Sequence, residues 1–309
     1  VEIGLGDRGQ DIGRAGVGVD DGDADFSGLA RIGIRGVTSS SFMMGVDQVD
    51  LVIQTGLEYR IQVPAVENEG VFHLRVFQCS DEEFAAIRDK CELAPERTHR
   101  IRLDQQDSPV DLDLTDYAAV IVGGGPGCVS DAPEQKSALE ARIEQQILNR
   151  MPQIPARYHP FMGCCYGLGI LAHHLGGDEG KARYGEPAGP SVCTLMPDGA
   201  GDPLLAGLDA EFEVFVGHKE AVQSLPPGAA HLLGSAPCPV QMIRYGRNVY
   251  ATQFHPEADT DDFTLRIDIY RNHGYFQPHE ADELKNRVSL KPTPYAQEIL
   301  RRFVERYFC

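Results

Sequence analysis

Residues 163–167 read GCCYG and place Cys165 at the centre of a G-x-C-x-G motif. A strand-like segment precedes the motif and a helix-like segment follows it, which is typical of a nucleophile elbow. The two glycines make room where the backbone crowds neighbouring chain, and Cys164 is expected to face back into the sheet. The start of the helix favours a negatively charged sulfur, and the backbone N–H of Tyr166 is placed to bind a developing oxyanion. The alternative is two small buried cysteines at a tight turn.

Residues 253–257 read QFHPE and end the strand-like segment NVYATQF. A cysteine nucleophile needs a base, and the base needs an acceptor that fixes its tautomer. His255 and Glu257 can supply the two roles. The triplet HPE alone is weak, but here it follows Cys165 by 90 residues in a chain that also carries the elbow. The prediction is therefore a triad of Cys165 as nucleophile, His255 as base and Glu257 as orienting acid.

The elements that must position these residues alternate from residue 71 onward. Apolar or alternating runs predict strands at 71–79, 99–103, 117–125 and in the segment 156–167 that leads into the elbow. Helical spacing predicts helices at 81–91, from Pro133 to about 148, and at 168–177. The connections are short. This pattern favours an α/β fold with a doubly wound, mostly parallel sheet and helices on both faces.

Two further regions complete the predicted domain. Segment 192–254 is rich in strands, with a hairpin turn at 245–248, and forms an insertion. The C-terminal tail is helical from about 278, with PTP at 292–294 between its pieces. Its last apolar stripe is expected to dock against the domain, with a partner-binding helix as the alternative; the stripe is Ile299, Leu300, Phe303 and Tyr307.

The first 70 residues differ from the rest. Residues 1–45 hold eleven glycines and the acidic run DDGDAD, which predicts weak order. Strand-like pieces occur at 51–53 and 59–63. We therefore expect an N-terminal extension over 1–70 and one domain over 71–309, with Met43 or Met44 as a hypothetical start of the native protein.

The composition excludes several classes of function. With 46 acidic and 28 basic residues, the formal charge of −18 disfavours nucleic-acid binding. The opening residues have no signal-peptide pattern, and no apolar run reaches the roughly 18 residues of a membrane span. The eight cysteines include no CxxC pair, which favours reduced thiols in the cytoplasm. His173 and His174 have no metal-ligand spacing around them, and residues 123–127 lack a phosphate-binding fingerprint. We expect no metal and no cofactor.

The motifs GCCYG, QFHPE and VIVGGGPG (120–127) together resemble class I glutamine amidotransferases from about residue 71 to 276. The likeness to stand-alone GMP-synthase-like glutaminase domains rests on residues 238–257 and 215–220. The resemblance implies a flavodoxin-like fold and a triad of Cys165, His255 and Glu257. It also implies an oxyanion hole that Gly124 and Gly125 complete, and a loop against bound glutamine at Gly217, His218 and Lys219.

Two positions depart from the family pattern. Gly169 stands where the family elbow continues to a glutamine, and residues 217–220 read GHKE where the family commonly has SHGD. Both places touch glutamine in the family, so a γ-glutamyl compound other than free glutamine is an alternative substrate.

The expected reaction is hydrolysis of the glutamine side-chain amide through a γ-glutamyl thioester. The sequence has no ATP-pyrophosphatase signature of the SGG-x-DS type, so the ammonia is expected to pass to a separate synthetase subunit. The alternatives are a stand-alone hydrolase of γ-glutamyl amides or peptides, and a non-catalytic regulatory binding protein. No nucleic-acid or membrane partner is expected.

Overall fold

The computed structural model describes residues 81–105, 112–125, 127–271 and 276–308, together with short strands before them. Contacts divide the chain into two units, Val1–Phe72 and His73–Cys309. In the first unit the described residues form two antiparallel pairs, β1 (Val17–Gly18) with β3 (Gly33–Ile34) and β2 (Ala30–Arg31) with β4 (Met43–Met44). The predicted strand pieces at 51–53 and 59–63 lie outside the described residues, and the weak order of 1–70 stays a prediction.

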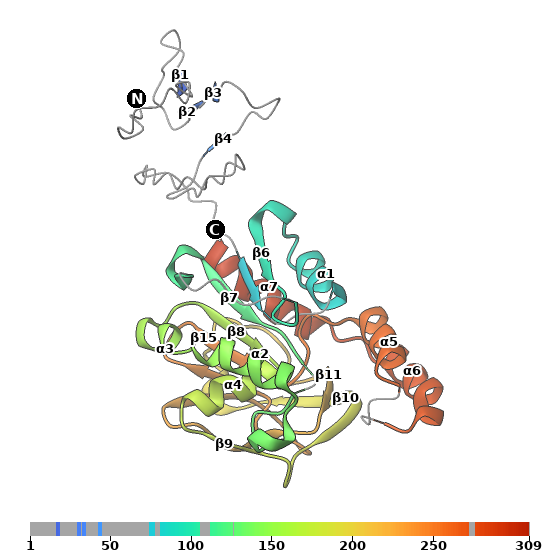
Figure 1. Ribbon diagram of the computed structural model, residues 1–309. Coiled ribbons are helices and arrows are strands. Elements are labelled where there is room, and N and C mark those ends of the chain that lie inside the picture. The colour runs from blue at the N-terminus through green and yellow to red at the C-terminus, as the bar shows by residue number, and fades with distance from the viewer. Residues whose placement is uncertain are drawn as a thin grey trace. The chain divides into compact units, whose positions relative to one another are not determined.

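The second unit is built on a nine-stranded sheet of order β11-β10-β13-β14-β15-β8-β7-β5-β6 (Figure 1). Neighbours from β15 to β6 pair in parallel, and neighbours from β11 to β15 pair antiparallel. The strands are β5 (Leu74–Phe77), β6 (Thr98–Ile101), β7 (Ala119–Val122), β8 (Phe161–Cys164), β10 (Glu186–Leu195), β11 (Glu211–His218), β13 (Ala229–Ser235), β14 (Met242–Tyr245) and β15 (Val249–Thr252). The α/β fold and its strand-rich insertion are thus confirmed.

The antiparallel region contains one predicted and one unpredicted pairing. The hairpin between β14 and β15 is confirmed, with Gly246 at φ +59° in its turn. A separate two-stranded sheet pairs β9 (Asp178–Gly180) with β12 (Ala221–Ser224). These short strands carry no alternating apolar pattern, so no local signal predicts them.

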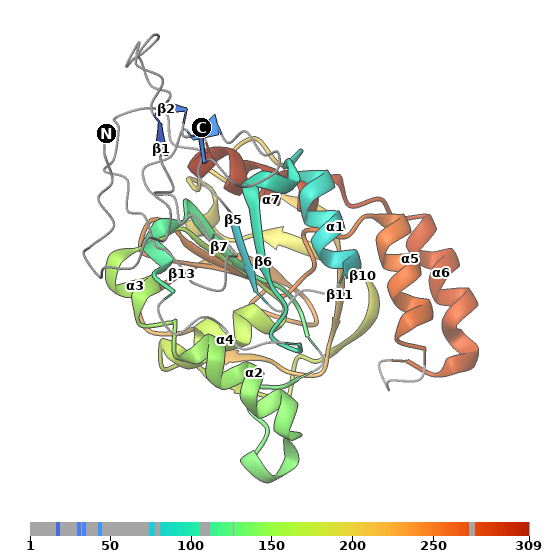
Figure 2. The same cartoon turned by 45° about the horizontal axis from the view of Figure 1, so that its top comes forward.

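Helices cover both faces of the sheet, as predicted (Figures 1 and 2). Apolar residues of α2, α3 and α4 pack on one face, and those of α1 and α7 pack on the other. Strand β7 is buried on both sides because Ala119 and Ile121 face one core and Val120 and Val122 face the other. The helices are α1 (Asp81–Lys90), α2 (Ala138–Leu148), α3 (Gln153–Arg157), α4 (Tyr166–His174), α5 (Thr260–Ile269), α6 (Ala281–Ser289) and α7 (Pro294–Phe308).

The helix predicted from Pro133 begins later than expected. Pro133–Gln135 forms a single 3₁₀ turn, and α2 starts at Ala138. Ser137 Oγ accepts the Glu140 N–H at 3.2 Å, while Glu140 Oε2 accepts the Ser137 N–H at 2.8 Å. This capping box fixes the helix start, and it outweighs the preference of proline for a first helical turn.

The tail helix α7 docks on the domain, as predicted. Ile299, Leu300 and Phe303 are completely buried in the core that α1 shares, and Tyr307 packs beside them. Helices α5 and α6 lie side by side (Figure 2) and cover a third apolar cluster. In that cluster Phe263 of α5 stacks on Phe215 of β11 at 4.7 Å between ring centroids. Among the described residues, no helix is long and apolar enough to cross a membrane.

Candidate active site

Cys165 lies between β8 and α4, at the carboxyl edge of the parallel strands. Its φ of +52° and ψ of −95° are strained for a residue with a side chain. The Cys165 N–H donates to Thr252 O of β15 at 2.8 Å, which holds the turn in place. Cys164 faces the core, as predicted, and burial raises the pKa of its thiol well above the usual value. Only Cys165 of this pair is therefore open to a substrate, because it lines two cavities.

The two glycines of the elbow lie where the backbone is crowded, as predicted. A Cβ atom on Gly163 would stand 2.6 Å from the carbonyl of Gly167. One on Gly167 would stand 2.7 Å from Val122 O of β7. Real Cβ atoms do not approach other atoms this closely, so side chains at either position would push α4 away from the sheet.

His255 and Glu257 follow β15 and are buried beside Cys165. The backbone N–H of His255 donates to Phe215 O at 2.9 Å, which fixes the chain after β15. Its ring donates from Nδ1 to Glu257 Oε1 at 2.8 Å. Cys165 lines a cavity together with His255 and is close enough to raise the pKa of the ring. The three predicted triad residues are therefore brought together in the order nucleophile, base and acid.

The electrostatics of this group favour a charged imidazole. Burial and Arg266 lower the pKa of His255, but Glu257 and Cys165 outweigh them and raise it to about 9. Burial raises the pKa of Glu257, whereas His255 and Arg266 bring it below its usual range. At neutral pH the pair is thus a buried imidazolium and carboxylate.

Two residues that the sequence did not single out complete the group. Arg266 of α5 donates from Nη2 to Glu257 Oε1 at 3.0 Å. The same nitrogen lies 3.4 Å from Glu83 Oε1 of α1, and that oxygen is 3.9 Å from His255 Nδ1. Both residues come from helices with an ordinary charged surface pattern, so no local sequence signal distinguishes them.

The predicted oxyanion residues surround the same point. Tyr166 is the first residue of α4, so its N–H has no acceptor within the helix. A Cβ atom on Gly124 would stand 2.9 Å from His255 Cε1, so glycine is needed for the ring to lie there. Gly125 borders both cavities that Cys165 lines. Their service as an oxyanion hole stays a prediction.

Two cavities meet at Cys165. The polar cavity, of about 410 Å³ including its mouth, contains all four predicted substrate-binding residues, Gly169, Gly217, His218 and Lys219, together with Glu179 and Glu220. The aromatic cavity, of about 490 Å³ including its mouth, lies on the His255 side and is walled by Phe263, Ile267, Tyr270 and Phe276.

The loop after β11 explains both departures from the family pattern. Glu220 accepts the N–H groups of Val129 at 3.0 Å and Ser130 at 2.6 Å. Its carboxylate passes over α4, and a Cβ atom on Gly169 would stand 3.1 Å from Glu220 Oε1. Glu220 therefore occupies space that a longer side chain at 169 would need. The His218 side chain is only 3% exposed and turns toward Glu186 rather than into the open cavity.

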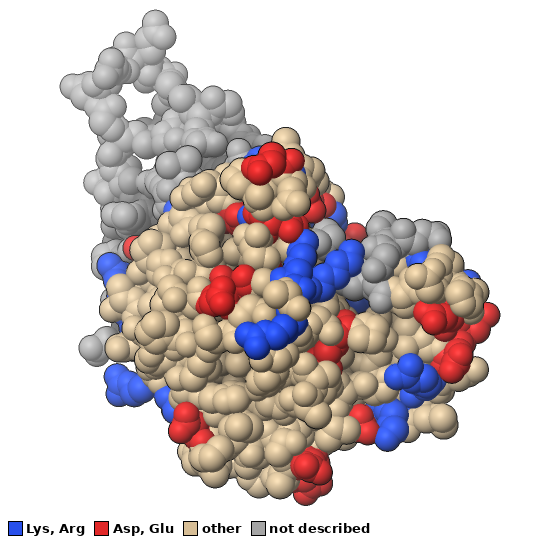
Figure 3. All heavy atoms as spheres, turned by 90° about the horizontal axis from the view of Figure 1, so that it is seen from below, with Lys and Arg blue, Asp and Glu red and all other residues tan. Residues whose placement is uncertain are grey.

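On the face seen in Figure 3, acidic and basic side chains are scattered over a mostly uncharged surface, and several basic side chains lie together near its centre. The whole chain has an acidic balance, with 46 acidic against 28 basic residues.

A family comparison agrees with this fold and geometry. The profile of the family Glutamine amidotransferase class-I matches residues 90–268. The chain therefore belongs to the class I glutamine amidotransferases, an enzyme family, and within it is GMP-synthase-like.

Two curated relatives illustrate the likeness. The glutamine-hydrolyzing GMP synthase of Thermomicrobium roseum is 35% identical over 142 residues, which cover 45% of this chain and 23% of that protein. A glutamine-hydrolyzing GMP synthase subunit of Haloarcula marismortui is 36% identical over 100 residues, 32% of this chain and 51% of that protein. The chain thus spans about a quarter of the first relative and half of the second.

Solved structures share the fold. A glutamine amidotransferase from Thermotoga maritima superposes with a TM-score of 0.60 at 18% identity, over 77% of this chain and 98% of that one. A glutamine amidotransferase from Methylobacillus flagellatus gives a TM-score of 0.58 at 20% identity, over 75% and 94%. At such identities the likeness supports the fold alone.

Proposed function

We propose that the chain hydrolyses the side-chain amide of glutamine through a triad of Cys165, His255 and Glu257 and delivers ammonia to a separate acceptor enzyme. The observation that carries this proposal is that Cys165, at a strained helix start, lines one cavity with His255, whose ring is hydrogen-bonded to Glu257. The amidotransferase domain would extend over residues 71–309, with residues 1–70 as an extension.

The steps follow from the geometry. The Cys165 thiolate attacks the amide carbon, and the oxyanion is bound by backbone N–H groups of Tyr166 and of the loop at Gly124 and Gly125. The His255 imidazolium then gives its proton to the leaving ammonia, and a γ-glutamyl thioester remains. His255, now neutral, takes a proton from water, which attacks the thioester and releases glutamate. Glu257 keeps the ring oriented throughout.

The polar cavity supports a zwitterionic amino acid as substrate. It borders the side chains of Glu179 and Glu220 and that of Lys219. Carboxylates suit the α-ammonium group of glutamine, and a cation or backbone N–H suits its α-carboxylate. Burial, and then the charge of Glu220, raise the pKa of Glu179 to about 8. A bound ammonium group would lower this pKa and so favour the charged carboxylate of Glu179.

The proposal of a separate acceptor enzyme rests on the name of one relative. The relative from Haloarcula marismortui is, by its own name, one subunit of a GMP synthase. We propose that this chain likewise serves a synthetase carried on a separate polypeptide. Affinity purification of the full chain from its own cells, followed by mass spectrometry, would identify such a partner. A cytoplasmic location also remains a prediction, which subcellular fractionation can test.

The direct test is glutamate release from L-glutamine by the purified chain. Cys165→Ala should lower the rate by at least about 10⁴-fold, because the covalent route is lost. Glu257→Gln should cost less, about 10²-fold, because it only orients the base. Equal rates for the parent and Cys165→Ala would refute the triad. Circular dichroism of each variant controls for folding.

A second candidate is a hydrolase of γ-glutamyl amides with a bulky leaving group. The aromatic cavity favours it, because ammonia needs no apolar wall and this cavity presents Phe263, Tyr270 and Phe276 beside His255. A γ-glutamyl anilide would place its ring there. A higher kcat/KM for the anilide than for glutamine would favour this second function, and the reverse ratio would favour the first. The family and the geometry of the triad disfavour a non-catalytic regulatory protein.

A further inference from the structure

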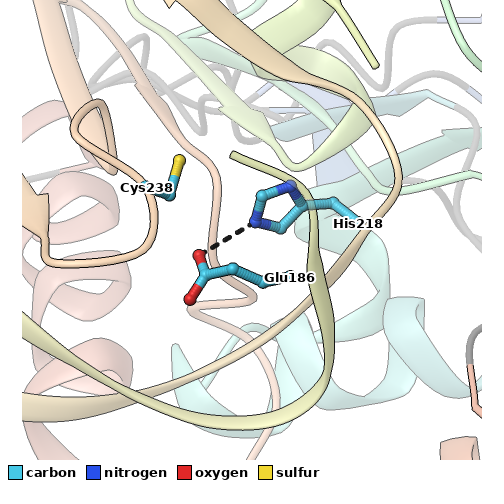
Figure 4. A group of neighbouring side chains, drawn as sticks. All are labelled: Glu186, His218 and Cys238. Carbon is cyan, nitrogen blue, oxygen red and sulfur yellow. Dashed lines mark hydrogen bonds and ion pairs between the residues drawn. The ribbon is translucent and has the colours of Figure 1, made fainter. Parts of the chain in front are cut away.

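A second group of polar side chains is buried behind the polar cavity. Glu186 begins β10, His218 ends β11, and Cys238 lies in the loop between β13 and β14. Figure 4 shows Glu186 and His218 joined by an interaction, with Cys238 beside them. All three residues are buried, and one ligand atom from each lies within 4.8 Å of the others.

The hydrogen bonds of His218 require a positive centre at this point. Its Nδ1 is 2.9 Å from Glu220 O, a backbone carbonyl that can only accept, so Nδ1 carries a proton. Its Nε2 is 3.1 Å from Glu186 Oε2. In a neutral ring Nε2 then presents a lone pair to a carboxylate oxygen. Either a second proton or a metal ion must lie between them.

The surroundings are those that orient metal ligands. A metal-binding histidine usually donates its other N–H to a carbonyl or carboxylate, and a ligating carboxylate is itself hydrogen-bonded. His218 has such a carbonyl in Glu220. Glu186 accepts from Ser191 Oγ at 2.8 Å on one oxygen and from Gln241 Nε2 at 2.6 Å on the other. Both side chains are thus fixed in position before any ion binds.

Two further atoms can complete the shell. The Cys238 thiol is completely buried and donates a long hydrogen bond of 3.6 Å to Val240 O. Gln241 Oε1 is buried without a hydrogen-bond partner among the described residues, although the other atom of its amide contacts Glu186. A buried acceptor without a partner is costly, and a cation would satisfy it.

We propose that Glu186, His218 and Cys238 bind one zinc ion, with Gln241 Oε1 as the fourth ligand. Sulfur, imidazole nitrogen and carboxylate oxygen are the ligands zinc prefers in tetrahedral sites. The 3.1 Å between His218 Nε2 and Glu186 Oε2 is close to the roughly 3.3 Å edge of such a tetrahedron. Cys238 Sγ would move to the roughly 2.3 Å bond distance of a zinc thiolate. Coordination would release the thiol proton to solvent.

Such an ion would fix three separate segments behind the polar cavity. It would join the start of β10 and the end of β11 to the loop that precedes β14. His218 and Glu220 belong to the loop that borders the polar cavity, so the ion would hold that loop from behind. The role is therefore structural, and it is independent of the amide chemistry proposed for Cys165.

The test measures zinc in the full chain carrying Cys165→Ala, because the triad cysteine and histidine would bind zinc themselves. The protein is unfolded, stripped with a chelator, refolded with zinc sulfate, and desalted, since the buried site would exchange slowly. Atomic emission should find about one zinc per chain. Refolding with cobalt chloride instead should give the near-ultraviolet absorption of a thiolate–cobalt bond.

Four further substitutions make the result specific. Cys238→Ser and His218→Asn should each weaken zinc binding by more than about 100-fold, and Ser191→Ala by about 10-fold, as a residue that orients a ligand would. Cys193→Ser is the matched control, because Cys193 is equally buried in β10 but outside the group. It should keep the zinc and the cobalt absorption.

The alternative occupant is a proton. If refolded Cys165→Ala holds no zinc, or if Cys238→Ser holds as much zinc as Cys193→Ser, the proposal is wrong and a proton lies between His218 and Glu186. Circular dichroism shows whether each variant has refolded. Should Cys238→Ser fail to fold, Glu186→Gln keeps the size of the side chain and an oxygen that can accept from Gln241, and it must still lose the zinc.

Discussion

Arg266 Nη2 donates to the same oxygen of Glu257 that accepts the proton of His255 Nδ1. One carboxylate oxygen therefore joins the base to a helix, α5, that lies outside the parallel sheet. Glu83 Oε1 lies 3.4 Å from the same Arg266 nitrogen, so a second carboxylate faces the positive charge of Arg266. The orientation of His255 thus depends on two helices as well as on the strand that precedes it.

Replacing Arg266 with Gln should destabilise the protein by about 3–5 kcal/mol, because it leaves buried carboxylates without their partner. It should also move the alkaline limb of the pH–activity profile to higher pH, because Arg266 lowers the pKa of His255. Urea unfolding and the pH profile measure the two effects. Arg271→Gln, which breaks half-exposed ion pairs, is the control and should cost less than about 1 kcal/mol. Equal costs for the two variants would contradict the buried network.

Stability should fall as the pH rises through the pKa of His255. Burial and Arg266 lower that pKa, but Glu257 and Cys165 raise it to about 9, against roughly 6.5 in an unfolded chain. A raised pKa contributes stability that is complete below about pH 6.5 and is lost as the pH approaches 9. The loss amounts to about 3 kcal/mol. Urea midpoints measured from pH 6 to 10 should show this slope, and His255→Gln should lack it.

The same logic, with the opposite sign, applies to Glu257. Its pKa is lowered, chiefly by His255 and then Arg266, against the effect of burial. The stability it contributes is present above the usual range of a glutamate and is lost as the pH falls through its own lower pKa. Glu257→Gln should therefore flatten the acid limb of the stability curve. An unchanged acid limb would show that other carboxylates determine it.

Gly167→Ala should destabilise the elbow by about 1–3 kcal/mol, because the new methyl group would stand 2.7 Å from Val122 O. Activity should fall by more than stability predicts, since α4 and the Tyr166 N–H would shift together. Gly201→Ala is the matched control: its Cβ would meet nothing within 4 Å, and it should leave both properties unchanged. Thermal unfolding and glutaminase rates measured side by side would decide the matter.

Tyr270→Ala separates the two candidate substrates. Tyr270 forms part of the wall of the aromatic cavity. An aromatic contact with a bound ring contributes about 1 kcal/mol of binding free energy in addition to the burial of apolar surface. The kcat/KM for a γ-glutamyl anilide should drop by about 5- to 10-fold, while that for glutamine stays within about 2-fold. Ile269→Ala, at an exposed position of the preceding helix outside this cavity, should change neither. A uniform loss on both substrates would mean that Tyr270 supports the triad instead.

The elements and motifs that were predictable from sequence are those with local signals. The apolar run at β7 and the glycines around Cys165 each act through neighbours within a few residues, so their pattern is visible in the chain. The start of α2 was misplaced because proline at 133 is a common first helical residue, whereas the capping box of Ser137 with Glu140 decides the boundary.

The remaining residues of the site had no such signal. Glu83 and Arg266 meet at Glu257 only because α1 and α5 pack against the same end of the sheet. Glu186, His218 and Cys238 are separated by 32 and 20 residues, far from any metal-binding spacing, and the sheet brings them together. Groups assembled by tertiary packing alone cannot be recognised from spacing.

The bond from Cys165 N–H to Thr252 O has a consequence for synthesis of the protein. The nucleophile leaves the ribosome long before β15, which supports its turn, and before the base and its acceptor. At roughly 5–20 residues per second, the hundred or so residues from Cys165 to Arg266 take about 5–20 s to translate. During that interval a nascent chain has a cysteine but no elbow geometry to activate it. The cysteine is therefore inactive until the residues from β15 to Arg266 have been synthesised and have folded around it.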